Sequence, residues 1–348
     1  MKVYLITDST GFYGQRSYPW ESIDVDIIIG TLKKDFELEQ VTFDAIVNGE
    51  VDIEGALVLY TSSQQPEYKE YIEDVLIYLM QKGNALVPSI NMFKSHENKG
   101  YQELHKKLVG IESIPSLYVG HHKEILKKPW QHPSVLKDLG GYGSDGVNLV
   151  QSMKDVSDLT TTDECLLRRG FLRRMLSKVA KPIRKHVFGK KYIDSVDYGD
   201  YYSHFKRFVL QKFLQDMTYD YKVLIINSKF YVLKRYAREG DFRASGSGNF
   251  SFEDVSDVLL DYAESVFFKF NEPFISLDIC FDGTKHHLIE FQGMHFGPYT
   301  LTHSKGYYMK NGGRWIFNEC FSELDVEVAE SLLNYLKMNK FYPSASHQ

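Results

Sequence analysis

The chain has 348 residues, of which 43% are hydrophobic and 14% aromatic, and its formal net charge is -5. This length and composition allow a large core in two or three domains, and the acidic balance gives no general attraction to nucleic acid. The three cysteines show no paired spacing, which excludes a disulfide framework and a thiolate zinc site. No run approaches the roughly 20 apolar residues that span a bilayer, and the apolar start is too short for a signal peptide. We therefore expect an enzyme-sized cytoplasmic protein that binds no nucleic acid.

Residues 2–90 alternate short apolar runs with one long helical pattern. The spacing predicts a helix over residues 68–81 and strands at residues 3–7, 27–29, 56–60 and 85–90. Strands and helices in this alternation predict a small open α/β sheet. The first strand is not followed by Gly-x-Gly-x-x-Gly, so we expect no dinucleotide site there.

A glycine-rich loop at residues 140–147 follows a helix and two extended segments. A helix through Lys107, ending near Gly110, precedes an extended segment at residues 114–118 and a strand at residues 134–139. The loop reads Gly140-Gly141-Tyr142-Gly143-Ser144-Asp145-Gly146-Val147, after Lys137 in the strand. Bare backbone N–H groups beside a lysine are suited to hold phosphate. The alternative is a flexible hairpin tip, because the spacing matches neither the P-loop nor the kinase loop.

Residues 164–191 differ in composition from the rest of the chain. Apolar residues recur there at helical spacing, and Pro182 interrupts this pattern. Glu164 is the one acidic residue of the segment. Its basic residues are Arg168, Arg169, Arg173, Arg174, Lys178, Lys181, Arg184, Lys185, Lys190 and Lys191. A basic amphipathic helix can lie on an anionic membrane surface or bind a polyanionic partner. The alternative is a solvated insertion that packs through its apolar stripe.

The remaining chain predicts strands, a loop and two helices. Strands are predicted at residues 208–214, 220–226 and 229–236, the last two joined across Asn227-Ser228, and helices at residues 252–270 and 324–336. Between them, residues 238–248 read Arg-Glu-Gly-Asp-Phe-Arg-Ala-Ser-Gly-Ser-Gly. This cationic, glycine-rich loop is suited to cover a charged intermediate.

Residues 274–292 contain two β-rich runs that flank the turn signal Asp282-Gly283. Asp278 lies in the first run, and Glu290 and Gln292 lie two residues apart in the second, so the latter two share a face. Two carboxylates and an amide oxygen form a site of the kind that Mg²⁺ accepts beside nucleotide phosphates. The alternative is a hairpin with polar residues on its solvated face.

The length of the hairpin loop decides whether Asp278 can join Glu290. A two-residue turn would pair Asp278 with His287, which faces away from Glu290, because paired residue numbers sum to a constant. A three-residue loop would pair Asp278 with Leu288, on the face of Glu290. We therefore predict an odd-length loop or a β-bulge, with a positive φ at Gly283.

Taken together, these residues resemble the ATP-grasp superfamily, in particular the carboxylate–amine ligases that include D-alanine–D-alanine ligases and ribosomal-protein glutamate ligases. The resemblance covers roughly residues 97 to 297. Its most specific part is an ordered series: Gln-Lys-Phe-Leu at residues 211–214, Asp-Tyr-Lys-Val at 220–223, Lys234-Arg235, Glu-Gly-Asp-Phe-Arg at 239–243, Asp278, and Glu-Phe-Gln at 290–292.

The resemblance assigns roles by position. Lys99 and Lys137 resemble the lysines that meet the ATP phosphates, and Gly143, Ser144, Asp145 and Gly146 the loop that covers them. Gln211, Lys212, Phe213 and Leu214 resemble the hinge whose backbone reads adenine, and Asp220 the acid that holds the ribose. Lys234 and Arg243 resemble the catalytic cations, and Asp278, Glu290 and Gln292 the magnesium ligands. Lys212 stands where the family commonly has Glu, and Gln292 where it commonly has Asn.

The resemblance also implies a fold and a domain organisation. The expected fold class is α/β (α+β), an ATP-grasp fold with an N-terminal open α/β domain at residues 1–93. Residues 94–207, with the basic insertion at about 160–192, and residues 208–348 would form the two ATP-grasp subdomains.

The implied reaction uses ATP and two Mg²⁺ ions to form an amide from a carboxylate and an amine through an acyl phosphate. The basic segment suggests glycan- or lipid-linked substrates, with an amino acid attached to a sugar acid in surface-polysaccharide biosynthesis. It also suggests peripheral contact with the inner face of the membrane. The alternatives are a small-molecule kinase and a non-catalytic ATP-binding scaffold.

Overall fold

The computed structural model describes residues 2–17, 20–120, 124–125, 130–141, 145–160, 206–215, 217–252 and 255–339. The chain forms two compact units. Unit 1 comprises residues 1–114, 140–145 and 214–348, and unit 2 comprises residues 115–139 and 146–213. The predicted division at residues 93 and 207 stays a prediction.

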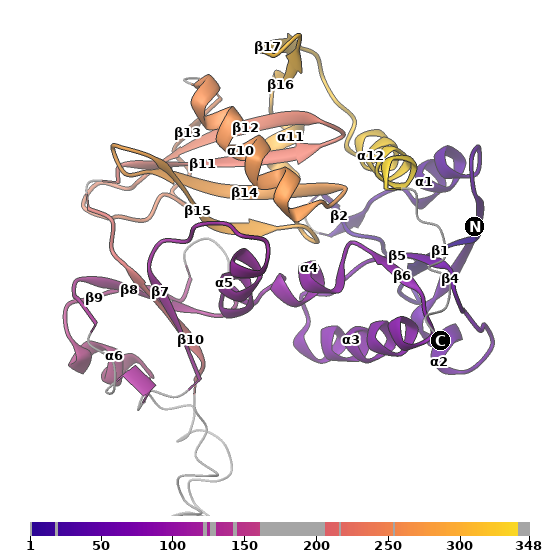
Figure 1. Cartoon of the computed structure of the whole chain (residues 1–348), viewed down its shortest axis with the longest axis horizontal. Coiled ribbons are helices and arrows are strands. Elements are labelled where there is room, and N and C mark those ends of the chain that lie inside the picture. The colour runs from indigo at the N-terminus through magenta and orange to yellow at the C-terminus, as the bar shows by residue number, and fades with distance from the viewer. Residues whose placement is uncertain are drawn as a thin grey trace, which may run out of the picture. The chain divides into compact units, whose positions relative to one another are not determined.

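The N-terminal part of unit 1 is the predicted open α/β sheet (Figure 1). Its four strands are parallel in the order β4-β1-β5-β6. They are β1 (Lys2–Thr7), β4 (Glu37–Thr42), β5 (Leu57–Tyr60) and β6 (Ala85–Val87). The helices are α1 (Val25–Leu32), α2 (Phe43–Val47), α3 (Pro66–Gln81), α4 (Ile90–Ser95) and α5 (Lys99–Leu108), and β2 (Gln15–Ser17) pairs with β3 (Glu21–Ser22).

The strand predicted at residues 27–29 is wrong, because this segment lies in α1. Three consecutive isoleucines favour a strand locally. Here the Asp24 side chain accepts hydrogen bonds from the backbone N–H groups of Asp26 and Ile27 and caps a helix. Ile28 and Leu32, one helical turn apart, are both fully buried. Capping and burial at helical spacing therefore override the intrinsic preference of the isoleucines.

The second sheet of unit 1 is antiparallel in the order β15-β14-β11-β12-β16-β17, with β13 also pairing with β12. Its strands are β11 (Tyr219–Ile226), β12 (Lys229–Tyr236), β13 (Phe250–Ser251), β14 (Phe274–Phe281), β15 (His286–Gln292), β16 (Gly306–Asn311) and β17 (Arg314–Glu319). The helices of this part are α10 (Asp257–Phe270), α11 (Tyr299–Thr302) and α12 (Leu324–Met338), and α12 packs beside α1 (Figure 1).

Alternating residues of β11 separate the two faces of this sheet. Val223 and Ile225 point into one core, which also contains apolar residues of α10 and α3. Leu224 and Ile226 point into a second core with α1 and α12. Nearer its N-terminus, β11 places Asp220 and Lys222 on the face of Leu224, because strand residues two apart share a face. The candidate site is built on this polar end.

Unit 2 contains an antiparallel sheet in the order β7-β10-β8-β9. Its elements are β7 (Ser116–Val119), β8 (Ser134–Asp138), β9 (Val147–Val150), α6 (Met153–Thr160) and β10 (Phe208–Lys212). One face packs on a small core that includes Leu136, Val156 and Leu210.

The predicted basic helix at residues 164–191 lies outside the described residues, as do Gly143 and Ser144 of the glycine-rich loop. Within the described ranges, the helices are too short or too polar to cross a bilayer.

Candidate active site

The β14–β15 hairpin brings Asp278 directly opposite Glu290. Phe281 pairs with His286, so the loop has four residues, and regular pairing from this loop would turn Asp278 away from Glu290. A β-bulge between Ile279 and Asp278 shifts the register by one residue and restores a common face. Gly283 in the loop has a φ of 91°. The predicted bulge and positive φ are both confirmed.

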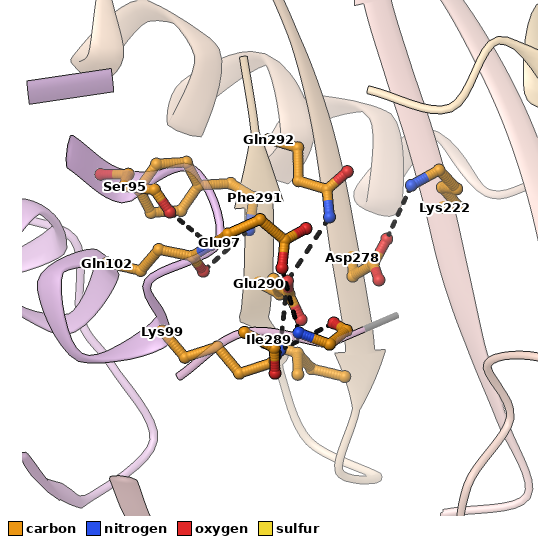
Figure 2. A network of polar contacts seen from close by, with 12 residues as sticks. Ser95, Glu97, Lys99, Gln102, Lys222, Asp278, Ile289, Glu290, Phe291 and Gln292 are labelled. Carbon is orange, nitrogen blue, oxygen red and sulfur yellow. Dashed lines mark hydrogen bonds and ion pairs between the residues drawn. The ribbon is translucent and has the colours of Figure 1, made fainter. Parts of the chain in front are cut away.

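Cations from two neighbouring elements surround these carboxylates (Figure 2). The Lys222 Nζ lies 3.6 Å from Asp278 Oδ1, and the Lys99 Nζ lies 3.9 Å from Glu290 Oε1. The Gln292 amide lies beside Glu290, with its Nε2 3.5 Å from Glu290 Oε1. Of the residues predicted from the sequence, Lys99, Asp278, Glu290 and Gln292 therefore lie together in unit 1.

Arg235 joins two carboxylates of this face. Its Nη2 lies 3.0 Å from Asp278 Oδ2 and its Nε lies 2.6 Å from Asp220 Oδ1. Burial alone would raise the pKa of Asp278, but the charges of Arg235 and Lys222 outweigh it and hold this pKa below its ordinary value. Burial raises the pKa of Asp220 despite its pairing with Arg235. Asp220, predicted to hold ribose, thus has one carboxylate oxygen engaged by an arginine.

Helix α5 fixes β15 through one polar face. Gln102 accepts a hydrogen bond from the backbone N–H of Phe291, and Lys106 donates to the carbonyls of Leu288 and Ile289, the residues at the bulge. Lys106 is fully buried and pairs with Glu103 at 2.5 Å. The same helix therefore supplies Lys99 to the site and holds the irregular strand that carries Glu290.

The start of the glycine-rich loop contacts Lys99 and its neighbour Glu97 (Figure 2). Lys99 Nζ donates to the carbonyls of Gly140 and Gly141, and Glu97 accepts from the Gly141 N–H. Gly141 has a φ of 103°, and a Cβ there would lie 2.9 Å from the carbonyl oxygen of Asp145. This loop conformation therefore requires glycine at position 141.

In unit 2, Lys137 and Gln211 share one face of the sheet, because Lys137 pairs with Val209, two residues before Gln211. Both side chains are buried, and within the described part of the chain Gln211 Nε2 has no hydrogen-bond partner. Lys212 ends β10, and the chain passes to unit 1 between Phe213 and Leu214. Gly146 closes the glycine-rich loop, and its carbonyl accepts from the Asp138 N–H.

Lys234 does not face the carboxylates, whereas its neighbour Arg235 does, and the catalytic role of Lys234 stays a prediction. Lys234 pairs with Tyr221, on the opposite face of the sheet from Asp220 and Arg235. Its Nζ lies 4.4 Å from the centre of the Tyr219 ring and 5.4 Å from that of Tyr236.

Arg243, the second predicted catalytic cation, bonds to Asp241 in its own loop at 2.8 Å. Its hydrogen bonds are the main cause that lowers the pKa of Asp241.

The sequence contains a signal that selects Arg235 over Lys234. A two-residue turn at Asn227-Ser228 makes paired residue numbers sum to a constant, which sets Asp220 opposite Arg235 and turns Lys234 away. Lys222, two residues after Asp220, then falls on the same face.

The donor set of Asp278, Glu290 and Gln292 fits Mg²⁺, which accepts one or two carboxylates together with substrate oxygens. Across the described ranges, no cluster of three or more His, Cys, Asp or Glu side chains forms a metal site. Lys222 and Arg235 lie closer to Asp278, at 3.6 and 3.0 Å, than Lys99 lies to Glu290, at 3.9 Å.

Comparison with known proteins gives fold relationships at low identity. No protein-family model matches the sequence, and no curated protein matches it. A RiPP-associated ATP-grasp ligase from Chryseobacterium gregarium, solved with ADP and a leader and core peptide, is similar with a TM-score of 0.50 and 10% identity over 97% of each chain.

Two further solved structures have lower TM-scores. A RimK-domain ATP-grasp protein from Sphaerobacter thermophilus has a TM-score of 0.48 and 10% identity, covering 96% of this chain and 99% of its own. D-alanine–D-alanine ligase from Bacillus anthracis has a TM-score of 0.42 and 14% identity, covering 84% of this chain and 86% of its own.

Proposed function

We propose, from the premise that this chain has an ATP-grasp fold, that it is an ATP-dependent carboxylate–amine ligase. The observation that carries the proposal is the bulged pairing of Asp278 with Glu290 beside Lys222, Arg235 and Lys99. Opposed carboxylates next to several cations suit the transfer of a phosphoryl group, which depends on positioning and charge neutralisation.

The charge balance of this face argues for a metal-bound nucleotide. Four carboxylates, Asp220, Asp278, Glu290 and Glu97, lie with three cations, Lys99, Lys222 and Arg235, so the site has no excess positive charge to attract a triphosphate. Mg²⁺ held by Asp278, Glu290 and Gln292 would supply that excess and neutralise charge on the phosphates. The number of ions, two in our prediction, stays part of the proposal.

Residues of unit 2 would contribute to nucleotide binding. Lys137 offers a buried charge for a phosphate, and the Gln211 amide offers a buried donor within the same face. Phe213 and Leu214 directly follow β10, in keeping with their proposed contact with adenine.

In the proposed reaction a substrate carboxylate oxygen attacks the γ-phosphorus of ATP, which gives an acyl phosphate and ADP. An amine nitrogen then attacks the acyl carbon, phosphate leaves, and the nitrogen loses a proton to form the amide. Lys222 and Arg235 would stabilise charge on the transferred phosphoryl group. Arg243, in the glycine-rich loop at residues 238–248, would approach the acyl phosphate when that loop closes.

The substrates are proposed only by class. The Chryseobacterium gregarium ligase is solved with peptides, which makes a peptide carboxylate one candidate acid. The sugar acid of surface-polysaccharide biosynthesis, glycan- or lipid-linked substrates and membrane contact all rest on residues 164–191, outside the described ranges.

The test is a screen of acid and amine pairs with ATP and Mg²⁺, reading ADP and phosphate release separately. A ligase releases phosphate only when both substrates are present, and Glu290→Gln should lower this rate about 10²–10³-fold. ADP formation with a stable phosphorylated acid and no amine requirement would identify a kinase instead. Tight ATP binding without turnover for any pair would identify a scaffold.

A further inference from the structure

A cavity of about 350 Å³ lies in unit 1 at the carboxyl-terminal edge of the parallel sheet. Asp8 follows β1, and residues 61–65 follow β5. From β1 the chain continues to β4 on one side, and from β5 it continues to β6 on the other, so the strand order reverses between β1 and β5. Open α/β sheets bind ligands at this point, and the volume is within the range of small-molecule sites.

The cavity wall combines aromatic rings with polar side chains and one formal charge. Phe12, Trp20 and Tyr68 supply the rings, and residues 61–65 supply hydroxyl and amide groups. Burial is the main cause that lowers the pKa of His295 to about 4, so its ring is neutral at physiological pH. Among the described lining residues, Asp8 then carries the only charge.

The hydrogen-bonding state of His295 makes it an acceptor. Its Nε2 lies 3.1 Å from the carbonyl oxygen of Ser62, which can only accept, so Nε2 carries the proton and Nδ1 a lone pair. In the described part of the chain, His295 Nδ1 and Ser62 Oγ are buried without a partner. The Ser62 hydroxyl can donate or accept, whereas His295 Nδ1 can only accept, and an unsatisfied buried acceptor is costly, so the wall is suited to a ligand that donates hydrogen bonds.

Asp8 and Trp20 add to this preference. Asp8 Oδ1 accepts from the N–H groups of Thr10 and Phe12, while Oδ2 accepts no hydrogen bond from the residues within the described ranges. Trp20 has a φ of 99° and is 45% exposed, and its ring meets His295 edge-on at 6.0 Å. A bulky residue held in this backbone region is typical of ligand contacts, and aromatic faces attract cations.

We propose that this cavity binds the amine substrate, a ligand that presents a primary ammonium group on an apolar body. The ammonium donates to Asp8 and to His295 Nδ1, and the apolar body packs against the rings of Phe12, Trp20 and Tyr68. Lys69, the nearby cation, donates to the carbonyl of His96 and is not among the described residues of the wall. The inference rests on the proposed function only in calling the ligand a substrate.

Three probes of matched size test the proposal: benzylamine, benzyl alcohol and benzoate, which are cationic, neutral and anionic. Calorimetry on the full chain without ATP should show benzylamine binding at least tenfold tighter than benzyl alcohol, with benzoate weakest. Asp8→Asn should weaken benzylamine about tenfold and leave benzyl alcohol unchanged. Asparagine keeps the Oδ1 that accepts from Thr10 and Phe12, so the loop is preserved. Asp74→Asn, at an exposed position of α3, is the matched control.

Equal binding of the three probes, preference for benzoate, or no binding of benzylamine at millimolar concentration overturns the proposal. An Asp8→Asn variant that binds benzylamine like the wild type overturns it as well. Because ATP is omitted, the outcome is separate from the ligase test. Selective amine binding with no phosphate release from any acid and amine pair would refute the ligase and leave the cavity assignment standing.

Discussion

The two hairpins that build the candidate site reach their register by different means. In β11–β12 the pairing is regular from the turn onward, and Asn227 and Ser228 both have positive φ, the geometry of a two-residue turn. In β14–β15 a four-residue loop would separate Asp278 from Glu290, and the bulge corrects this. A turn is sufficient to set the first register, whereas the second depends on contacts from helix α5.

The dependence on α5 can be broken at Lys106. Lys106→Met removes the donor to the bulge carbonyls and leaves the Glu103 carboxylate buried without its lysine. We expect the free energy of unfolding to fall by about 3–5 kcal/mol, the scale for removing one partner of a buried ion pair. Denaturant titration measures this loss, with exposed Lys107→Met as the control.

A double variant separates stability from register. Glu103→Gln with Lys106→Met removes both charges, which is often nearly neutral for stability, so much of the loss should be recovered. ADP release should remain low, because the bulge carbonyls still lack their donor. Wild-type turnover in the double variant would mean that the bulge forms without Lys106.

Substitutions at two adjacent cations on opposite faces of β12, Lys234 and Arg235, test the register of the regular hairpin β11–β12. Arg235→Met removes the cation that pairs with both Asp278 and Asp220. We expect turnover to fall about 10²–10³-fold, which is the effect of removing one preorganised charge. Lys234→Met should change turnover by less than threefold or so, because Lys234 packs among tyrosines on the other face. Steady-state ADP release compares them, and an equal or reversed order would contradict the register.

Much of the fold could be predicted because local signals agreed with tertiary packing. The helix at residues 68–81 and the strands around Asn227-Ser228 appear as α3, β11 and β12. The strand prediction for the isoleucines at residues 27–29 is wrong because the helix cap at Asp24 and burial beside α12 outweigh their preference for a strand. The contact of Asp24 N with Asp325 spans most of the sequence, so no local pattern reveals it.

Part of the candidate site could also be predicted, because the pairing within a hairpin follows from local residue counting. Counting residues in the β14–β15 hairpin predicted that Asp278 needs an odd-length loop or a bulge to meet Glu290, and the structure has the bulge. The same counting in β11–β12 places Arg235, and not Lys234, on the face of Asp220, whereas the resemblance assigns the role to Lys234. Lys106 could not be found this way, since its role depends on how α5 packs against β15.

A buried carboxyl just before β14, that of Glu272, should make the free energy of unfolding depend on pH. Glu272, two residues before β14, is 3% exposed and accepts from the Ser89 N–H that begins α4. Burial raises its pKa to about 7. The folded state therefore keeps a proton that the unfolded state loses above about pH 4.5, so stability should fall as pH rises from about 4.5 to 7.

Glu272→Gln removes this titration while keeping an oxygen for Ser89. The variant should match the wild type near pH 4 and exceed it by roughly 3 kcal/mol above pH 7. Denaturant titrations across this range measure the difference. A difference that does not grow with pH would show that Glu272 ionises in the folded protein as it does in the unfolded chain.

Both turns should favour glycine, so adding it at position 228 and removing it from position 283 should change stability in opposite directions. Ser228 has a φ of 58°, so Ser228→Gly relieves left-handed strain and should stabilise the protein by about 0.5 kcal/mol after the entropy cost of glycine. Gly283 has a φ of 91°, and a Cβ added there would meet nothing within 4 Å, so Gly283→Ala costs backbone strain alone, about 1 kcal/mol. Thermal unfolding resolves both shifts. Because the bulge, and not the loop, sets the pairing of Asp278 with Glu290, Gly283→Ala should leave turnover unchanged, and a large loss of turnover would assign the register to the loop instead.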